Sequence, residues 1–203
     1  MKTELGIDEA GRGSILGPLV LAGVLVPDHK RDLLEALGIS DSKTYGSQQK
    51  GKKIREKLAE VITKNFEYEI IISYSKEVDD YVTHQSLNKL EQDIAERIIH
   101  KLPADKVILD GENLFKPLVT NNICAFNKAD LNYLSVSAAS ILAKSTRDRL
   151  FAEICQPYIF DFGEIKGGGY ANQATLKFVK WYMGKKGALP SFYRKSYKWK
   201  YLD

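Results

Sequence analysis

Several residue types are scarce in this 203-residue chain, and each scarcity argues against a class of protein. The two cysteines, Cys124 and Cys155, are too few for a disulfide framework and have no metal-ligand spacing. The three histidines, His29, His84 and His100, also lack ligand spacing, which argues against a zinc site. No apolar run approaches the ~20 residues of a membrane span, and the first residues show no secretory signal pattern. We therefore expect a protein of the reducing cytoplasm.

The overall composition is that of an ordinary globular protein, with 44% hydrophobic and 28% charged residues. The length fits one domain, or one domain with a small appendage. The net charge of +4 is unevenly divided: residues 166–203 contain nine Lys and Arg and one acid, Asp203, whereas residues 1–165 are slightly acidic. This division predicts a localised anion-binding surface near the carboxyl end of the chain.

Hydrophobic periodicity predicts an α/β protein in which helices pack on a sheet. The expected strands are 2–8, 18–26, 66–74, 106–110 and 122–126. The expected helices are 28–37, 46–64, 85–102, 134–154 and 175–183. Sites in such folds tend to lie at strand ends, and two of these strands end on an acid, Asp8 and Asp110.

The most informative segment follows the first strand. Asp8 and Glu9 are adjacent carboxylates, which repel each other unless a positive charge, a shared proton or a metal ion compensates. Gly11 and Gly13 allow a tight turn and the close approach of another molecule. Arg12 between them carries a planar guanidinium suited to phosphate. The segment therefore predicts chemistry on a polyanion.

Two further acids complete a set of oxygen ligands with Asp8 and Glu9. Asp110 ends a later strand, and Asp130 lies just before the 134–154 helix. Carboxylates without His or Cys favour Mg²⁺ or Mn²⁺ over zinc. Taken singly, Asp110 or Asp130 is better interpreted as a turn former or a helix cap.

One face of the 134–154 helix carries small hydroxyls followed by basic residues. Ser137, Ser140, Lys144 and Arg147 fall within one sector of about 80° at 100° per residue. Such a face suits phosphate contacts. The alternative is a solvated face with ordinary ion pairs, such as Lys144 with Asp148.

Two more positions stand out as ligand contacts. Lys43 precedes a basic helix whose charges suit a solvated face, but Lys43 itself lies in a loop that can present it to a ligand. Tyr170 follows Gly167–Gly169, and the glycines leave this aromatic ring little local packing. The region 166–202 interleaves further aromatics with basic residues, a combination that suits nucleic acid.

These motifs together resemble the ribonuclease HII family over nearly the whole chain. The resemblance is carried by Gly6-Ile7-Asp8-Glu9-Ala10-Gly11-Arg12-Gly13, Gly17-Pro18-Leu19-Val20, Asp41-Ser42-Lys43, Leu109-Asp110-Gly111, Lys128-Ala129-Asp130, the run from Ser135 to Lys144, Thr146-Arg147-Asp148, Gly169-Tyr170 and Arg194-Lys195-Ser196. The chain departs from the usual pattern at Ser14 and Ala171, where prolines are common.

The resemblance implies a ribonuclease H-like fold, a mixed five-stranded sheet flanked by helices, with a catalytic domain at 1–155 and a basic helical extension at 156–203. It implies that the four carboxylates bind two Mg²⁺ or Mn²⁺ ions. The implied activity is hydrolysis of the RNA strand of RNA/DNA hybrids and cleavage 5′ of ribonucleotides embedded in duplex DNA, leaving 3′-hydroxyl and 5′-phosphate ends.

The resemblance also implies roles for the substrate-binding residues. The Gly11–Gly13 backbone is expected to contact the ribose 2′-hydroxyl, Tyr170 to pack on the neighbouring deoxyribose, and Lys43 to lie near a phosphate. We expect a monomer without a membrane partner, and no sliding-clamp-binding tail is recognisable after Ser196.

Three alternatives remain at this point. A hybrid-only nuclease of the ribonuclease HIII type usually lacks Gly-Arg-Gly and has an additional amino-terminal domain. A non-catalytic nucleic-acid-binding module is disfavoured by carboxylates that would repel phosphate without a metal. An ATPase using Gly11–Gly13 as a phosphate loop would need a Gly-Lys-Ser/Thr sequence, which is missing here.

Overall fold

A mixed sheet organises the computed structural model, which describes residues 2–39 and 49–199. Its strand order is β3-β2-β1-β4-β5. The strands are β1 (Thr3–Ala10), β2 (Leu19–Pro27), β3 (Glu67–Ser73), β4 (Lys106–Asp110) and β5 (Ile123–Phe126). The first three pair antiparallel, and β1, β4 and β5 pair parallel. The sequence-based fold class and all five expected strands are confirmed.

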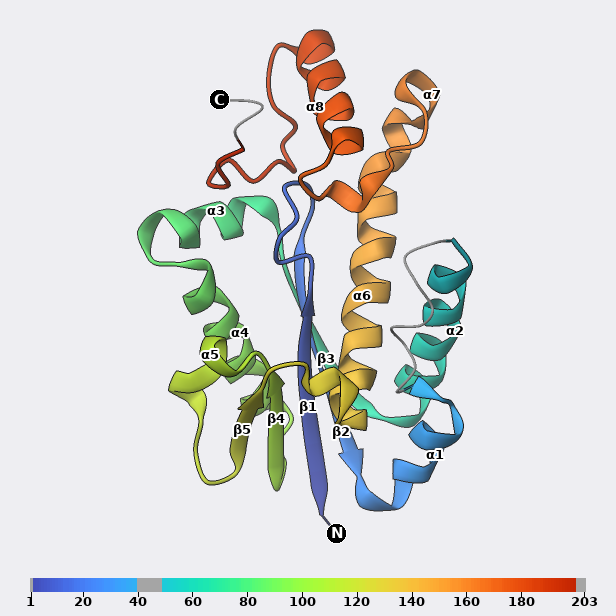
Figure 1. Ribbon diagram of the computed structural model, residues 1–203, viewed down its shortest axis with the longest axis vertical. Coiled ribbons are helices and arrows are strands. Elements are labelled where there is room, and N and C mark those ends of the chain that lie inside the picture. The colour runs from blue at the N-terminus through green and yellow to red at the C-terminus, as the bar shows by residue number, and fades with distance from the viewer. Residues whose placement is uncertain (1, 40–48, 200–203) are drawn as a thin grey trace.

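Helices cover both faces of this sheet, which Figure 1 shows nearly edge-on. Helices α3 (Ser75–His84), α4 (Leu87–Lys101) and α5 (Glu112–Phe115) lie on one side. Helices α1 (Arg31–Ala36), α2 (Gln49–Asn65) and α6 (Leu134–Cys155) lie on the other. Because both faces are covered, β2 is a continuous apolar strand, buried except at Pro27.

The central strand β1 determines where two of the predicted ligands lie. It runs parallel to β4, with Ile7 opposite Leu109 in the register. The next residues, Asp8 and Asp110, therefore emerge at the same end of adjacent strands. Side chains alternate between the two faces of a strand, so Asp8 and Glu9 leave β1 in opposite directions.

Helix α6 packs closely against β1 because small residues meet at the crossing. A Cβ atom on Gly6 would lie only 2.1 Å from the backbone carbon of Ser135 and 2.2 Å from the nitrogen of Val136. The following turns of α6 bury Ala138 and Ala139 completely. Glycine at position 6 is thus required by this approach of two backbones, and α6 lies directly beside the strand that carries Asp8.

The carboxyl-terminal segment packs on the upper end of α6 and on the loop after β1. It contains α7 (Ile159–Phe162) and α8 (Gln173–Lys186), both at the top of Figure 1. A separate apolar cluster joins Ile15 and Leu16 to Phe151 and Phe178. The loop after β1 therefore packs against residues distant in the sequence. The division of the chain into two parts at residue 155 stays a prediction.

The helices differ in detail from the expected ranges. Helix α3 was not expected, and residues 28–37 form a 3-10 turn, Asp28–Lys30, before α1 begins. The predicted 85–102 helix begins later, at Leu87, because Ser86 is its N-cap and accepts a hydrogen bond from Lys89 N at 3.1 Å. No helix among residues 2–39 and 49–199 is long and apolar enough to cross a membrane.

Candidate active site

The four predicted carboxylates line one pocket of about 380 Å³. Asp8 and Glu9 come from the end of β1 and Asp110 from the end of β4, while Asp130 lies in a 3-10 turn, Ala129–Leu131. Asp8 and Asp130 are buried, at 5% and 3% exposure. The tertiary structure thus brings together acids that are up to 122 positions apart in the sequence.

Hydrogen bonds fix the turn that presents Asp130 relative to β4. The backbone N–H of Ala129 donates to Asp110 Oδ1 at 2.8 Å. The Ser137 hydroxyl donates to the main-chain oxygen of Asp130 at 2.6 Å. Ser137 therefore has a structural contact with the turn and is buried, although the sequence predicted a phosphate contact for it.

Burial and neighbouring carboxylates disfavour the charged forms of two of the acids, Asp8 and Glu9. Burial, followed by the charge of Glu9, raises the pKa of Asp8 to about 7, while Lys144 and a hydrogen bond from Ser140 oppose the shift. Burial also raises the pKa of Glu9, and the charges of Glu91 and Asp110 add to this effect. A site that holds like charges together in this way is suited to a bound cation.

The donor set agrees with a hard divalent ion. The pocket offers carboxylate oxygens and one lysine, with no His or Cys among its lining residues. Among the described residues, however, no three His, Cys, Asp or Glu side chains are close enough to form a ready-made metal centre. The carboxylates share a pocket without the tight packing that ligation would need.

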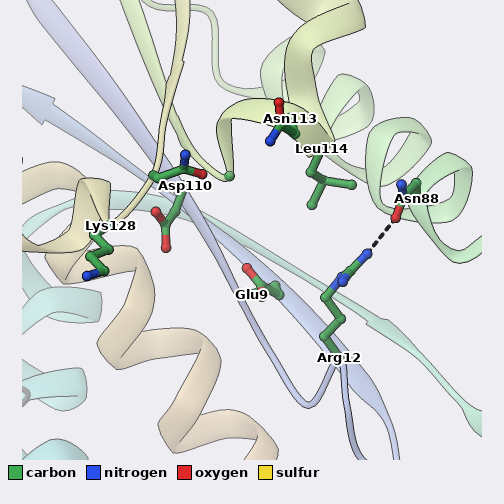
Figure 2. A pocket seen from close by; sticks show the side chains of 9 residues that line it. Glu9, Arg12, Asn88, Asp110, Asn113, Leu114 and Lys128 are labelled. Atoms are coloured by element: carbon green, nitrogen blue, oxygen red, sulfur yellow. Dashed lines mark hydrogen bonds between the residues drawn. The ribbon is translucent and has the colours of Figure 1, made fainter.

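A neighbouring pocket of about 570 Å³ extends the site toward α4 and α5. Glu9 and Asp110 also line this space, and Figure 2 shows them between Lys128 and Arg12. Lys128 has a positive φ of 58°, an uncommon conformation for a side-chain-bearing residue. Glu9 and Asp110 therefore line two adjoining hollows, whereas Asp8 and Asp130 line only the first.

The Arg12 side chain reaches α4, and Arg12 also lines the carboxylate pocket. Its Nε lies 2.8 Å and 3.1 Å from the two carboxylate oxygens of Glu91, which is fully buried, and one terminal nitrogen donates to Asn88 (Figure 2). These hydrogen bonds use Nε and Nη2, and the Arg12 side chain is still 41% exposed. Arg12 therefore anchors the turn through Glu91, and a phosphate contact by its side chain stays a prediction.

The Gly-Arg-Gly turn has little freedom to move. Gly11 has a φ of 88°, and a Cβ there would lie 2.5 Å from the Pro18 oxygen. The main-chain oxygen of Arg12 accepts hydrogen bonds from Arg194 Nη1 at 2.9 Å and from the Tyr197 hydroxyl at 2.7 Å. The residue types alone did not indicate the roles of Arg194 and Tyr197. The family motif Arg194-Lys195-Ser196 is the one sequence signal that could have pointed to Arg194.

Tyr170 lies beside this turn. Ile15 N donates to Gly169 O at 2.8 Å, and Ser14 and Tyr170 form an isolated β-bridge. A Cβ on Gly13 would touch the Tyr170 ring at 3.9 Å. The ring remains 45% exposed and lines the carboxylate pocket. The structure thus joins the two glycine motifs that the sequence presents separately.

The expected phosphate-contacting face of α6 is largely internal. Ser140 is fully buried and accepts a hydrogen bond from Lys144 Nζ at 2.6 Å, beside Asp8. Arg147 is only 3% exposed, donates to Ser14 Oγ at 2.9 Å and lies 5.2 Å from the Tyr170 ring centroid. Within this set only Lys144 lines the carboxylate pocket, and phosphate contacts by this face stay a prediction. Lys43 lies outside the described residues.

Comparison with known proteins agrees with this arrangement. The family model described as Ribonuclease HII matches residues 5–200. A ribonuclease HII from Methanobrevibacter smithii is 38% identical over 202 residues, covering 95% of this chain and 94% of that protein. The chain is thus similar to a curated protein over nearly the full length of both.

Solved structures show the same likeness. The ribonuclease HII in a complex with PCNA from Archaeoglobus fulgidus is 32% identical, with a TM-score of 0.83 over 98% of this chain and 96% of that one. A structure of Bst-RNase HIII with Mn²⁺ has a TM-score of 0.77 at 20% identity, over 92% of this chain and 63% of that one. The second likeness shows the shared fold alone.

Proposed function

Because the chain belongs to the ribonuclease HII family and is an endonuclease of the ribonuclease H type, we propose that it hydrolyses the RNA strand of RNA/DNA hybrids and cuts 5′ of ribonucleotides embedded in duplex DNA. The products would have 3′-hydroxyl and 5′-phosphate ends. The observation that carries this proposal is the convergence of Asp8, Glu9, Asp110 and Asp130 on one pocket beside the Gly-Arg-Gly turn and Tyr170.

The four carboxylates would hold Mg²⁺ or Mn²⁺ at this pocket. Such ions, when bound, supply an activated water and positive charge beside the leaving 3′ oxygen. Lys144 adds a fixed positive charge next to Asp8, since Ser140 holds its ammonium group. Burial raises the pKa values of Asp8 and Glu9, and a bound cation would favour their charged forms. Bst-RNase HIII, which shares the fold, was solved with Mn²⁺.

The protein's own backbone would select the ribonucleotide. The Gly11–Gly13 turn exposes main chain next to the carboxylates, and the 2′-hydroxyl distinguishes RNA from DNA. Arg194 and Tyr197 hold the Arg12 oxygen in place, and Glu91 holds its guanidinium, so the turn is organised before substrate arrives. Preorganised contacts cost little ordering at the moment of binding.

The first prediction tests the reaction itself. A DNA duplex with one embedded ribonucleotide, and a separate RNA/DNA hybrid, should both be cut in Mg²⁺ or Mn²⁺ and remain intact with chelator. Mapping the ends should give a single cut 5′ of the ribonucleotide, with 3′-hydroxyl and 5′-phosphate. An all-DNA duplex of the same sequence is the control. Cleavage of that duplex, or undiminished cleavage with chelator, would contradict the proposal.

The second prediction concerns Tyr170. Tyr170→Ala should reduce cleavage at a single embedded ribonucleotide by roughly tenfold or more, because loss of a stacking ring costs about 1–3 kcal/mol. Cleavage of a long hybrid should suffer less, since many registers remain available. Tyr170→Phe keeps the ring and should stay close to the parent on both substrates. Equal losses on the two substrates would argue against a role in recognising the RNA–DNA junction.

Two alternatives have less support. The ribonuclease HIII likeness extends to the fold only, at 20% identity, and a non-catalytic binding module disagrees with membership of a nuclease family. The Archaeoglobus fulgidus enzyme was solved with PCNA; for the present chain, action as a monomer without a clamp-binding tail stays a prediction.

A further inference from the structure

A third hollow, of about 740 Å³, lies between α2, α6 and the Gly167–Gly169 motif, and the described function does not use it. Two exposed lysines line it, Lys52 from α2 and Lys166 from the segment just before the Gly167–Gly169 motif. Tyr170 lines this hollow and also the carboxylate pocket. The two spaces therefore meet at one side chain. We call this hollow the basic cleft.

Of the two acids that line the basic cleft, one is already paired. Asp148 lies 3.2 Å from Arg55 Nη2 and 3.6 Å from Arg147 Nη1, so two arginines offset one carboxylate. The remaining acid on the lining is Glu164, which is exposed. Neither Lys52 nor Lys166 is in an ion pair with any described residue. The cleft thus keeps a positive surplus.

A buried cation fixes the base of the cleft. Arg147 is 3% exposed and is held by Ser14 Oγ, by Gly168 O and by stacking on Phe151, whose ring centroid is 4.8 Å away. Its Nε has no hydrogen-bond partner among the described residues. Burial weakens solvent screening, so this charge acts on the cleft more strongly than a surface lysine would.

We propose that the basic cleft binds a backbone phosphate of the duplex on the side of Tyr170 away from the carboxylates. This proposal rests on the proposed function, because it assumes a nucleic-acid substrate. A strand that contacts the exposed ring of Tyr170 would continue between Lys52 and Lys166. Flexible lysines from two segments suit a phosphate held by charge, which positions a duplex without reading its sequence.

The chain supplies matched controls on the same helix. Lys53 and Lys57 are exposed residues of α2 that do not line the cleft. Lys52→Ala and Lys166→Ala should each lower the slope of log K against log salt by about 1, as expected for one lost phosphate contact. Lys53→Ala and Lys57→Ala remove the same charge and should leave the slope unchanged.

Binding is measured without turnover in Asp8→Asn protein, using the duplex with one ribonucleotide at several salt concentrations. A single neutral methylphosphonate is then moved along each strand. We expect one phosphate position, on one side of the ribonucleotide, where removing the charge weakens duplex binding by the parent several-fold. At that position the same change should have little further effect on duplex binding by Lys52→Ala or Lys166→Ala. All four variants should melt with the parent, since these side chains are exposed.

Two results would overturn the proposal. If Lys52→Ala and Lys166→Ala change the salt slope no more than Lys53→Ala, the cleft binds no phosphate. Cleavage by the parent protein in that case would leave the proposed function intact. The same conclusion follows if no methylphosphonate position is coupled to these lysines. If the intact protein neither cleaves nor binds the ribonucleotide duplex, the proposed function fails as well.

Discussion

Asp8→Asn is expected to reduce cleavage of a ribonucleotide-containing duplex by at least about 10³-fold, or roughly 4 kcal/mol of transition-state stabilisation. The carboxylate is buried in the pocket beside Glu9, where removing one negative oxygen weakens cation binding directly. The amide keeps an oxygen that can accept the present 2.8 Å hydrogen bond from Glu9 N. The measurement is single-turnover cleavage in Mg²⁺ and in Mn²⁺.

The fold of Asp8→Asn should be retained. Burial and the Glu9 charge both disfavour the ionised form of Asp8, as its raised pKa shows. A neutral side chain of the same shape therefore removes a repulsion, and the melting temperature without divalent ions should not fall. Duplex binding should persist, because the phosphate contacts lie elsewhere.

Two further variants make this result specific. Asp110→Asn should show a similar loss, since its amide oxygen can still accept from Ala129 N. Asp161→Asn removes an exposed carboxylate on α7, near Lys185 but outside the pocket, and should retain parental activity. Full activity in purified Asp8→Asn would exclude Asp8 from the reaction and remove the main support for the proposed metal site.

Gly6→Ala is expected to have the largest effect on stability. A Cβ at this position would lie 2.1 Å from the Ser135 backbone, which no change of rotamer can relieve. The helix would have to move away from β1, at a cost at or above the upper end of the roughly 1–3 kcal/mol seen for overpacked cores. The melting temperature should fall by about 6–12 °C, because 1 kcal/mol corresponds to roughly 2–4 °C in a domain of this size.

Gly184→Ala is the matched control. Gly184 is an exposed residue of α8, and a Cβ there would meet nothing within 4 Å. Alanine in an exposed helix interior stabilises by about 0.5–1 kcal/mol relative to glycine. Glycine to alanine should therefore raise stability at Gly184 in α8 and lower it sharply at Gly6 in β1. A Gly6→Ala protein that melts with the parent would show that α6 can shift away from β1 without cost.

Local patterns in the sequence were sufficient for the strands and most helices. Alternation and continuous apolar runs locate β1 and β2 within two residues of their observed ends, because burial of those side chains stabilises the strands. Helix α3 was missed, since its polar residues leave only Val78 and Ser75 buried. The same local reading identified Asp8, Asp110 and Asp130 from their places beside strands and a helix.

The sequence by itself determined the chemical character of this protein: an oxygen-rich set of acids, two glycine-rich motifs and a basic carboxyl-terminal region. The tertiary structure decided which partners the arginine side chains contact. Arg12 pairs with Glu91, 79 residues away, and Arg147 is buried beneath Tyr170. A guanidinium has the same charge in solvent, on phosphate or inside the protein, so only the long-range packing of buried partners determines which of these it contacts.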